Sequence, residues 1–130
     1  MFEDRPEYVH AIGLATARMA LVENLLGQLL AKVLGIKPAV GQTIYLSSHT
    51  AFGRLATLDI TASSVLPPKD LEKLKALTKR ARDLLQRHND MPHDIWKAAD
   101  GAGLAAHLEK LNRQVEDLQA LEAELKDMLR

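Results

Sequence analysis

The spacing of the apolar residues constrains this chain more than any other feature. Leucine, alanine, valine and methionine recur at steps of three and four over residues 6–34, 69–89 and 104–130. Such spacing places one apolar stripe along an α-helix. Only five of the 130 residues are aromatic, which disfavours a packed β-sandwich. We therefore expect an all-α protein, an antiparallel, up-and-down bundle of four to five helices that forms a single domain over residues 1–130.

Local signals mark the ends of the first and last helices. Asp4 is a suitable N-cap for the first helix, Pro6 suits its first turn, and Gly35 is a suitable stop. The last stretch, over 104–130, approximates a heptad seam and would span about 40 Å as a helix. A helix of that length with one apolar seam needs a long partner. We expect the first helix to be that partner.

The middle of the chain is more interrupted. We expect two short helices, over 41–46 and 50–63, with Ser47 or Ser48 as the cap of the second. Pro92 has no backbone N–H and disfavours helical geometry in the residue before it. We therefore expect the preceding helix to end or kink at Pro92, and a short new helix to follow.

Composition excludes several classes of function. The chain has no cysteine, so disulfides, thiolate zinc sites and cysteine nucleophiles are excluded. The 17 basic and 17 acidic residues cancel, which disfavours a surface for long nucleic acid or for an anionic membrane. The cancellation is not local, because residues 69–87 hold seven basic and three acidic side chains. We expect Arg80 and Arg82 in this stretch to contact a short RNA or a nucleotide.

The first apolar stretch is long enough to cross a bilayer but carries Arg18, Glu23 and Lys32, which are costly at that depth. We expect a core helix, and a soluble, cytoplasmic protein without membrane contact. Apolar residues off its main stripe favour a second subunit, so we expect a homodimer. Glu23 needs a partner among these apolar residues, and Arg54 or a basic residue near the motif described next is the candidate.

Polar and ionisable residues concentrate between Arg87 and Trp96, in the run RHNDMPHDIW. A kink at Pro92 can bring Arg87 and His93 toward a common point. Arginine offers a forked cation that suits a phosphate, and a neutral histidine at a helix start can act as a general base. These residue types suit RNA cleavage, in which histidine removes the 2′-hydroxyl proton and arginine stabilises the phosphorus centre. His10, His49 and His107 are interpreted as surface histidines.

The run also resembles a known family. Arg87-His88 followed by His93 is similar to the R-[N/D/H]-x4-H signature of the HEPN superfamily of small all-α proteins, and Asn89, His93 and Trp96 resemble the R-N-xxx-H-xx-W motif of bacterial HEPN-like proteins. In the second pattern His88 stands where arginine is expected. The resemblance implies a HEPN-like fold and, in active members, metal-independent RNA cleavage at a site shared across a homodimer. It also implies non-catalytic members that bind nucleotides or proteins.

Other roles for the same residues stay open. Asp90 suits an N-cap for a helix at Pro92, and Asn89 either orients His93 or ends the preceding helix. Trp96 is interpreted as a core or interface anchor, with base stacking as the alternative. A metal site built on His88, Asp90, His93 and Asp94, as in HD-type phosphohydrolases, ranks lower, because neighbouring helical residues point about 100° apart.

Two functions follow from these observations. The first is a metal-independent, toxin- or defence-type endoribonuclease that uses Arg87 and His93, with Asn89 and His88 as further candidate catalytic residues. The second is a non-catalytic helical dimer that binds a nucleotide or another protein. No cofactor or metal is expected in either case. An RNA or nucleotide ligand and an antitoxin-type protein are the candidate partners.

Overall fold

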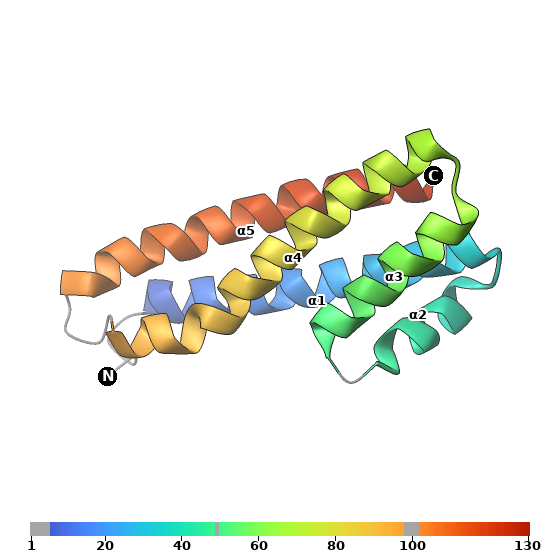
Figure 1. The fold of residues 1–130 in the computed structure, drawn as a ribbon. Coiled ribbons are helices and arrows are strands. Elements are labelled where there is room, and N and C mark those ends of the chain that lie inside the picture. The colour runs from blue at the N-terminus through green and yellow to red at the C-terminus, as the bar shows by residue number, and fades with distance from the viewer. Residues whose placement is uncertain (1–5, 49, 98–101) are drawn as a thin grey trace.

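The computed structural model describes residues 6–48, 50–97 and 102–130 of the chain. These residues form five helices and no strand, which confirms the all-α prediction. The helices are α1 (Pro6–Leu34), α2 (Pro38–Leu46), α3 (Ala51–Val65), α4 (Pro68–Lys97) and α5 (Ala102–Leu129). Each helix reverses the direction of the one before it, so α1 and α5 run in the same direction (Figure 1).

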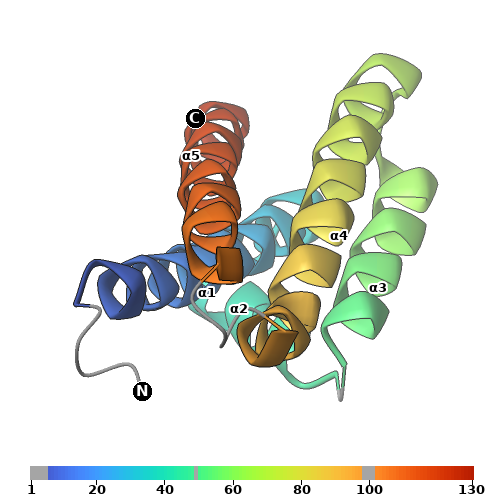
Figure 2. The ribbon, with the colours of Figure 1, turned by 90° about the vertical axis from the view of Figure 1, so that its left-hand side faces the viewer.

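The most extensive contact between helices joins α1 to α5, as the heptad seam predicted. The two helices meet at both ends. Tyr8 of α1 contacts His107 of α5 near the helix starts, and Lys32 Nζ donates to the Met128 carbonyl near the helix ends, at 2.7 Å. α4 lies between α5 and α3, and α2 packs on the C-terminal half of α1 (Figure 2). α1 therefore contacts all four of the other helices and keeps one outer face exposed.

The apolar core has two parts. The larger part lies where α1, α3, α4 and α5 meet and is built mainly of leucine. The smaller part, called here the N-terminal cluster, lies beside the start of α1 and near the RHNDMPHDIW run, and consists of Tyr8, Ala11, Ala15, Met91, Leu104, Leu111 and Val115. Both parts have α1, α4 and α5 in common, which explains why these three helices carry the long apolar patterns of the sequence.

Glycine allows α1 and α2 to approach closely. A Cβ atom added at Gly41 of α2 would lie 2.3 Å from Ala31 Cβ and 2.6 Å from Ala31 Cα of α1. Gly35 has a positive φ of 68° and follows the last residue of α1. The predicted stop at Gly35 is therefore confirmed, because this left-handed conformation favours glycine.

The predicted cap of α3 is wrong. The N-cap is Thr50, whose hydroxyl oxygen accepts a hydrogen bond from the Gly53 N–H at 3.0 Å. Ser47 instead ends α2, where its backbone N–H bonds to the Thr43 and Ile44 carbonyls. The helix starts where a hydroxyl can reach a free N–H three residues ahead, and Thr50 meets that condition.

We predicted that the helix would end or kink at Pro92, and the first alternative, with a separate short helix after it, is wrong. α4 continues through Pro92 to Lys97, although its last turns run in a different direction from its first turns (Figure 2). Asp90 is consequently no N-cap, and its carboxylate accepts a hydrogen bond from Gln86 Nε2 one turn earlier, at 3.0 Å. Nor does Asn89 end a helix. Met91 is buried in the N-terminal cluster, and this packing offsets the one backbone hydrogen bond that proline removes.

Candidate functional site

Arg87 faces α5. Its Nη1 atom lies 2.9 Å from Oδ2 of Asp117, and both side chains are about half exposed, at 54% and 52%. An ion pair in this setting contributes little to stability, because water and salt screen it. The guanidinium can therefore exchange Asp117 for another anion at small cost.

His88 faces the opposite way, toward the interior. Its Nδ1 atom is buried and finds no hydrogen-bond partner among the described residues. Burial lowers the pKa of His88 below its ordinary value of 6.5, and the negative charge of Glu23 partly opposes that shift. The neutral form of the imidazole is therefore favoured at neutral pH.

A polar cluster lies on this interior side of α4. Glu23 of α1 accepts a hydrogen bond from Arg54 of α3 at 2.9 Å, which confirms the predicted partner of Glu23. Asp59 of α3 accepts hydrogen bonds from Arg82 at 3.0 Å and from the Thr78 hydroxyl at 2.7 Å. The charges of this cluster therefore neutralise one another, and Arg82 serves to join α4 to α3.

The two remaining candidate catalytic residues, Asn89 and His93, are exposed. They lie four residues apart and so share one face of α4. Neither forms a side-chain hydrogen bond or an ion pair within residues 6–48, 50–97 and 102–130. The Trp96 side chain lies outside the part of the chain that the structure describes. Within one chain, Arg87, His88 and His93 consequently point to three different surroundings.

A pocket lies between α4 and α5 beside the motif and is called here the α4–α5 pocket. It encloses about 290 Å³. Its charged groups are three cations and two carboxylates, and its lining residues are Arg87, Asp90, Met91, Asp94, His107, Lys110, Leu111, Arg113 and Gln114. Arg87 therefore belongs both to the RHNDMPHDIW run and to the lining of this pocket, whose other two cations lie on α5.

His107 is buried, at 6% exposure, and not a surface residue as the sequence suggested. The Tyr8 hydroxyl and Nδ1 of His107 share a hydrogen bond, and their rings are 5.4 Å apart. Burial lowers the pKa of His107 below 6.5, while Asp94 partly opposes the shift. Burial and the charge of Asp94 together raise the pKa of Tyr8. A neutral imidazole, fixed in orientation by Tyr8, therefore forms one wall of the pocket.

Gln114 is the other buried polar residue of the pocket. Its side chain is 5% exposed, and Nε2 has no hydrogen-bond partner in the described structure. Sequence reasoning missed Gln114, Lys110 and Arg113. A signal was present, because residues 107, 114 and 121 are spaced by seven and two of these three seam positions are polar. Polar side chains on an apolar seam need partners.

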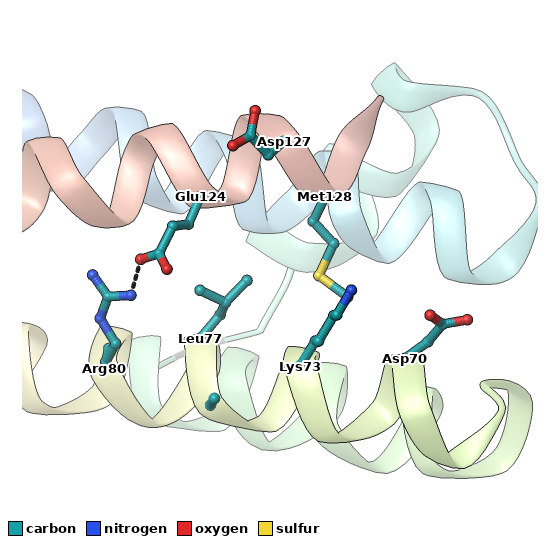
Figure 3. Close-up of a pocket in the computed structure, with 8 residues that line it drawn as sticks. Asp70, Lys73, Leu77, Arg80, Glu124, Asp127 and Met128 are labelled. Carbon is teal, nitrogen blue, oxygen red and sulfur yellow. Dashed lines mark hydrogen bonds and ion pairs between the residues drawn. The ribbon is translucent and has the colours of Figure 1, made fainter.

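A wider groove of about 540 Å³ separates the first half of α4 from the last half of α5 (Figure 3). Arg80 reaches across it to pair with Glu124. The charges along the groove oppose one another, because Lys73 and Arg80 face three carboxylates, those of Asp70, Glu124 and Asp127. The groove has no excess of positive charge that would favour RNA, although we predicted that Arg80 contacts a short RNA or a nucleotide.

No group of three or more histidine, aspartate or glutamate side chains among the described residues is placed to hold a metal ion. No single helix there has both the length and the apolar character to cross a membrane; α1 and α2 meet those two criteria only as a pair, and they are bent by 117°.

Comparisons of the chain with protein-family models, with curated protein sequences and with solved structures give no match.

Proposed function

We propose that this protein is a non-catalytic, HEPN-like helical module that binds a nucleotide or another protein and works as a homodimer. The observation that carries the proposal is the different surroundings of the two residues on α4, which continues through Pro92. Arg87 pairs with Asp117 of α5, whereas His93 is exposed and makes no side-chain hydrogen bond or ion pair in the described structure. A general base and a phosphate-binding cation must meet at one phosphate, so one chain does not supply both from this motif.

The homodimer is supported by the outer face of α1. Leu14 and Leu21 are exposed and lie seven residues apart, so they share one face of the helix. Exposed leucines in such a row favour association with another apolar surface. We expect Leu14→Glu/Leu21→Glu to convert a dimer into a monomer in analytical ultracentrifugation. As a control, Val65→Glu changes an exposed apolar residue of α3 and leaves the dimer intact. A monomeric wild-type protein at micromolar concentration contradicts the homodimer.

The decisive test of the non-catalytic function is an RNA-cleavage assay in EDTA with the wild-type protein and His93→Ala. We expect no cleavage by either, and equal melting temperatures, because His93 is exposed and makes no side-chain bond in the described structure. Cleavage by the wild type that His93→Ala abolishes contradicts the proposal.

One observation favours endoribonuclease activity as a second candidate function. Asn89 and His93 share an exposed face of α4, where a second copy of the chain could complete a site with its own arginine. That arrangement predicts metal-independent cleavage by the dimer alone. Mixing His93→Ala with Arg87→Met chains tests it, because a shared site regains part of its activity when each chain supplies the residue that the other lacks.

A further inference from the structure

We propose that the α4–α5 pocket binds a small phosphorylated sugar compound, no larger than a mononucleotide, through Lys110, Arg113 and the amide of Gln114. The proposal rests on the binding function given above and names the class of ligand. It concerns residues of α5 that lie outside the RHNDMPHDIW run.

Two cations that line the pocket have no anionic partner in the described structure. Lys110 and Arg113 have no carboxylate partner among the described residues, whereas Arg80, Arg82 and Arg87 each have one. Lys110 and Arg113 are three residues apart, so they share one face of α5 at the pocket wall. Hydrogen bonds from such cations to phosphate oxygens are stronger than those between neutral groups. These two side chains are thus available to an anion.

The amide nitrogen of Gln114 is buried and has no hydrogen-bond partner in the described structure. A buried N–H group without a partner destabilises a protein by about 1–3 kcal/mol. The Gln114 side chain is 5% exposed, lines the pocket and lies one residue after Arg113. Nε2 itself is covered in the free protein, but Gln114 lines the pocket, so a rotation of its side chain would bring Nε2 to a ligand oxygen and remove this cost. The free protein therefore carries a donor whose partner would come with the ligand.

The remaining walls restrict the ligand further. Asp90 and Asp94 lie across the pocket and can accept hydrogen bonds from the hydroxyl groups of a sugar. Neutral His107 and the apolar Met91 and Leu111 suit an uncharged part of the ligand. A phosphate without a sugar would leave the carboxylates facing an anion. A sugar phosphate or nucleoside monophosphate satisfies both groups of residues.

The volume sets an upper limit on size. Ligand pockets of proteins usually enclose about 300–1,000 Å³. At about 290 Å³, this pocket is at the low end of the range and suits one nucleotide unit, not an RNA chain.

The test is isothermal titration calorimetry of the full chain at low salt, with ribose 5-phosphate, adenosine monophosphate, inorganic phosphate and ribose as separate probes. We expect both phosphorylated sugars to bind at least about tenfold more tightly than inorganic phosphate or ribose. Lys110→Met and Arg113→Met should each weaken binding about tenfold, which corresponds to the loss of one charge-assisted hydrogen bond. Lys79→Met is the matched control, because it removes an exposed positive charge from α4 away from the pocket.

Gln114→Leu separates a ligand-binding role from a structural one. Because it removes an unpaired buried N–H, we expect a higher melting temperature for the free protein, together with binding at least about fivefold weaker. A purely structural glutamine would give lower stability and unchanged binding. The proposal is overturned if neither phosphorylated sugar binds, or if Lys79→Met weakens binding as much as Lys110→Met.

The two proposals fail separately. If the protein cleaves RNA in EDTA and also binds ribose 5-phosphate, the non-catalytic function is contradicted and the proposal for the pocket is supported. If the protein neither cleaves RNA nor binds any of the four probes, the proposal for the pocket is contradicted. The proposed non-catalytic function then holds in its protein-binding form.

Discussion

The two arginine–carboxylate pairs Glu23–Arg54 and Arg87–Asp117 have the same N–O distance, 2.9 Å, and very different exposure. The side chains of the first pair are 20% (Arg54) and 23% (Glu23) exposed, and those of the second are 54% and 52% exposed. This contrast allows the effect of burial on an ion pair to be measured within one molecule. We expect the coupling energy of the first pair to be clearly larger.

The magnitude follows from the surroundings of each pair. A hydrogen bond to a charged group contributes about 1.5–3 kcal/mol, and partial exposure at Glu23 and Arg54 places the expected coupling near 2 kcal/mol. For Arg87 and Asp117 the expected value is about 0.2–1 kcal/mol. For a chain of 130 residues, 2 kcal/mol corresponds to a change of about 7 °C in melting temperature.

The assay is a pair of double-mutant cycles by urea denaturation. One cycle uses Glu23→Gln and Arg54→Met, and the other uses Arg87→Met and Asp117→Asn. Arg54→Met also removes the bond from Arg54 Nε to the Ser48 carbonyl, but this loss occurs in the single and the double variant alike and cancels in the cycle. Raising the salt concentration to 1 M should reduce the second coupling more than the first. Equal couplings, or a larger one for Arg87–Asp117, would refute the reasoning.

Three further predictions concern backbone fit, capping and pH. Gly41→Ala should destabilise the protein by about 1–3 kcal/mol in urea denaturation because its Cβ would meet the α1 backbone, whereas Gly13→Ala, with open space around it, should stabilise by about 0.5–1 kcal/mol. Thr50→Ala should lower the free energy of unfolding by about 1 kcal/mol, and Thr50→Ser, which keeps the capping hydroxyl, should restore most of the loss. Burial lowers the pKa of His88 and His107 in the folded state, so below about pH 6.5 the unfolded chain binds protons that the folded chain does not, and the melting temperature should fall as the pH is lowered from 7.5 to 5.5. Replacing both histidines with glutamine should flatten that slope, and an unchanged slope would contradict the assigned burial.

The long helices were predictable because every turn repeats the same signal. The face of α1 that includes Met19, Val22 and Leu26 is buried as its spacing indicated, and the seam of α5 packs on α1. The same logic identified Glu23, since a charge on an otherwise apolar stretch requires a partner, and Arg54 supplies it.

The helix ends and the behaviour of the chain at Pro92 were less predictable because tertiary packing decides them. Ser47, Ser48 and Thr50 are all suitable caps by residue type, and only the three-dimensional path of the chain selects Thr50. Local preference argues for a helix end at Pro92, yet burial of Met91 favours continuation.

The pocket was the least predictable part of the candidate site. Two of its three cations, Lys110 and Arg113, come from α5, and the third, Arg87, comes from α4, which packs beside α5. Residue spacing within one helix does not reveal which side chains of another helix it will face. The polar residues His107 and Gln114 were the only local clue.

The pairing of α1 with α5 has a consequence for protein synthesis. The N-terminal cluster joins Tyr8, Ala11 and Ala15 of α1 to residues of α5, which the ribosome makes last in the printed chain. At a translation rate of about 5–20 residues per second, α1 is complete several seconds before its main partner exists. During that interval its apolar stripe has no α5 to cover it. The nascent chain, more than the finished protein, is therefore the form that a chaperone would bind and the form most prone to aggregate.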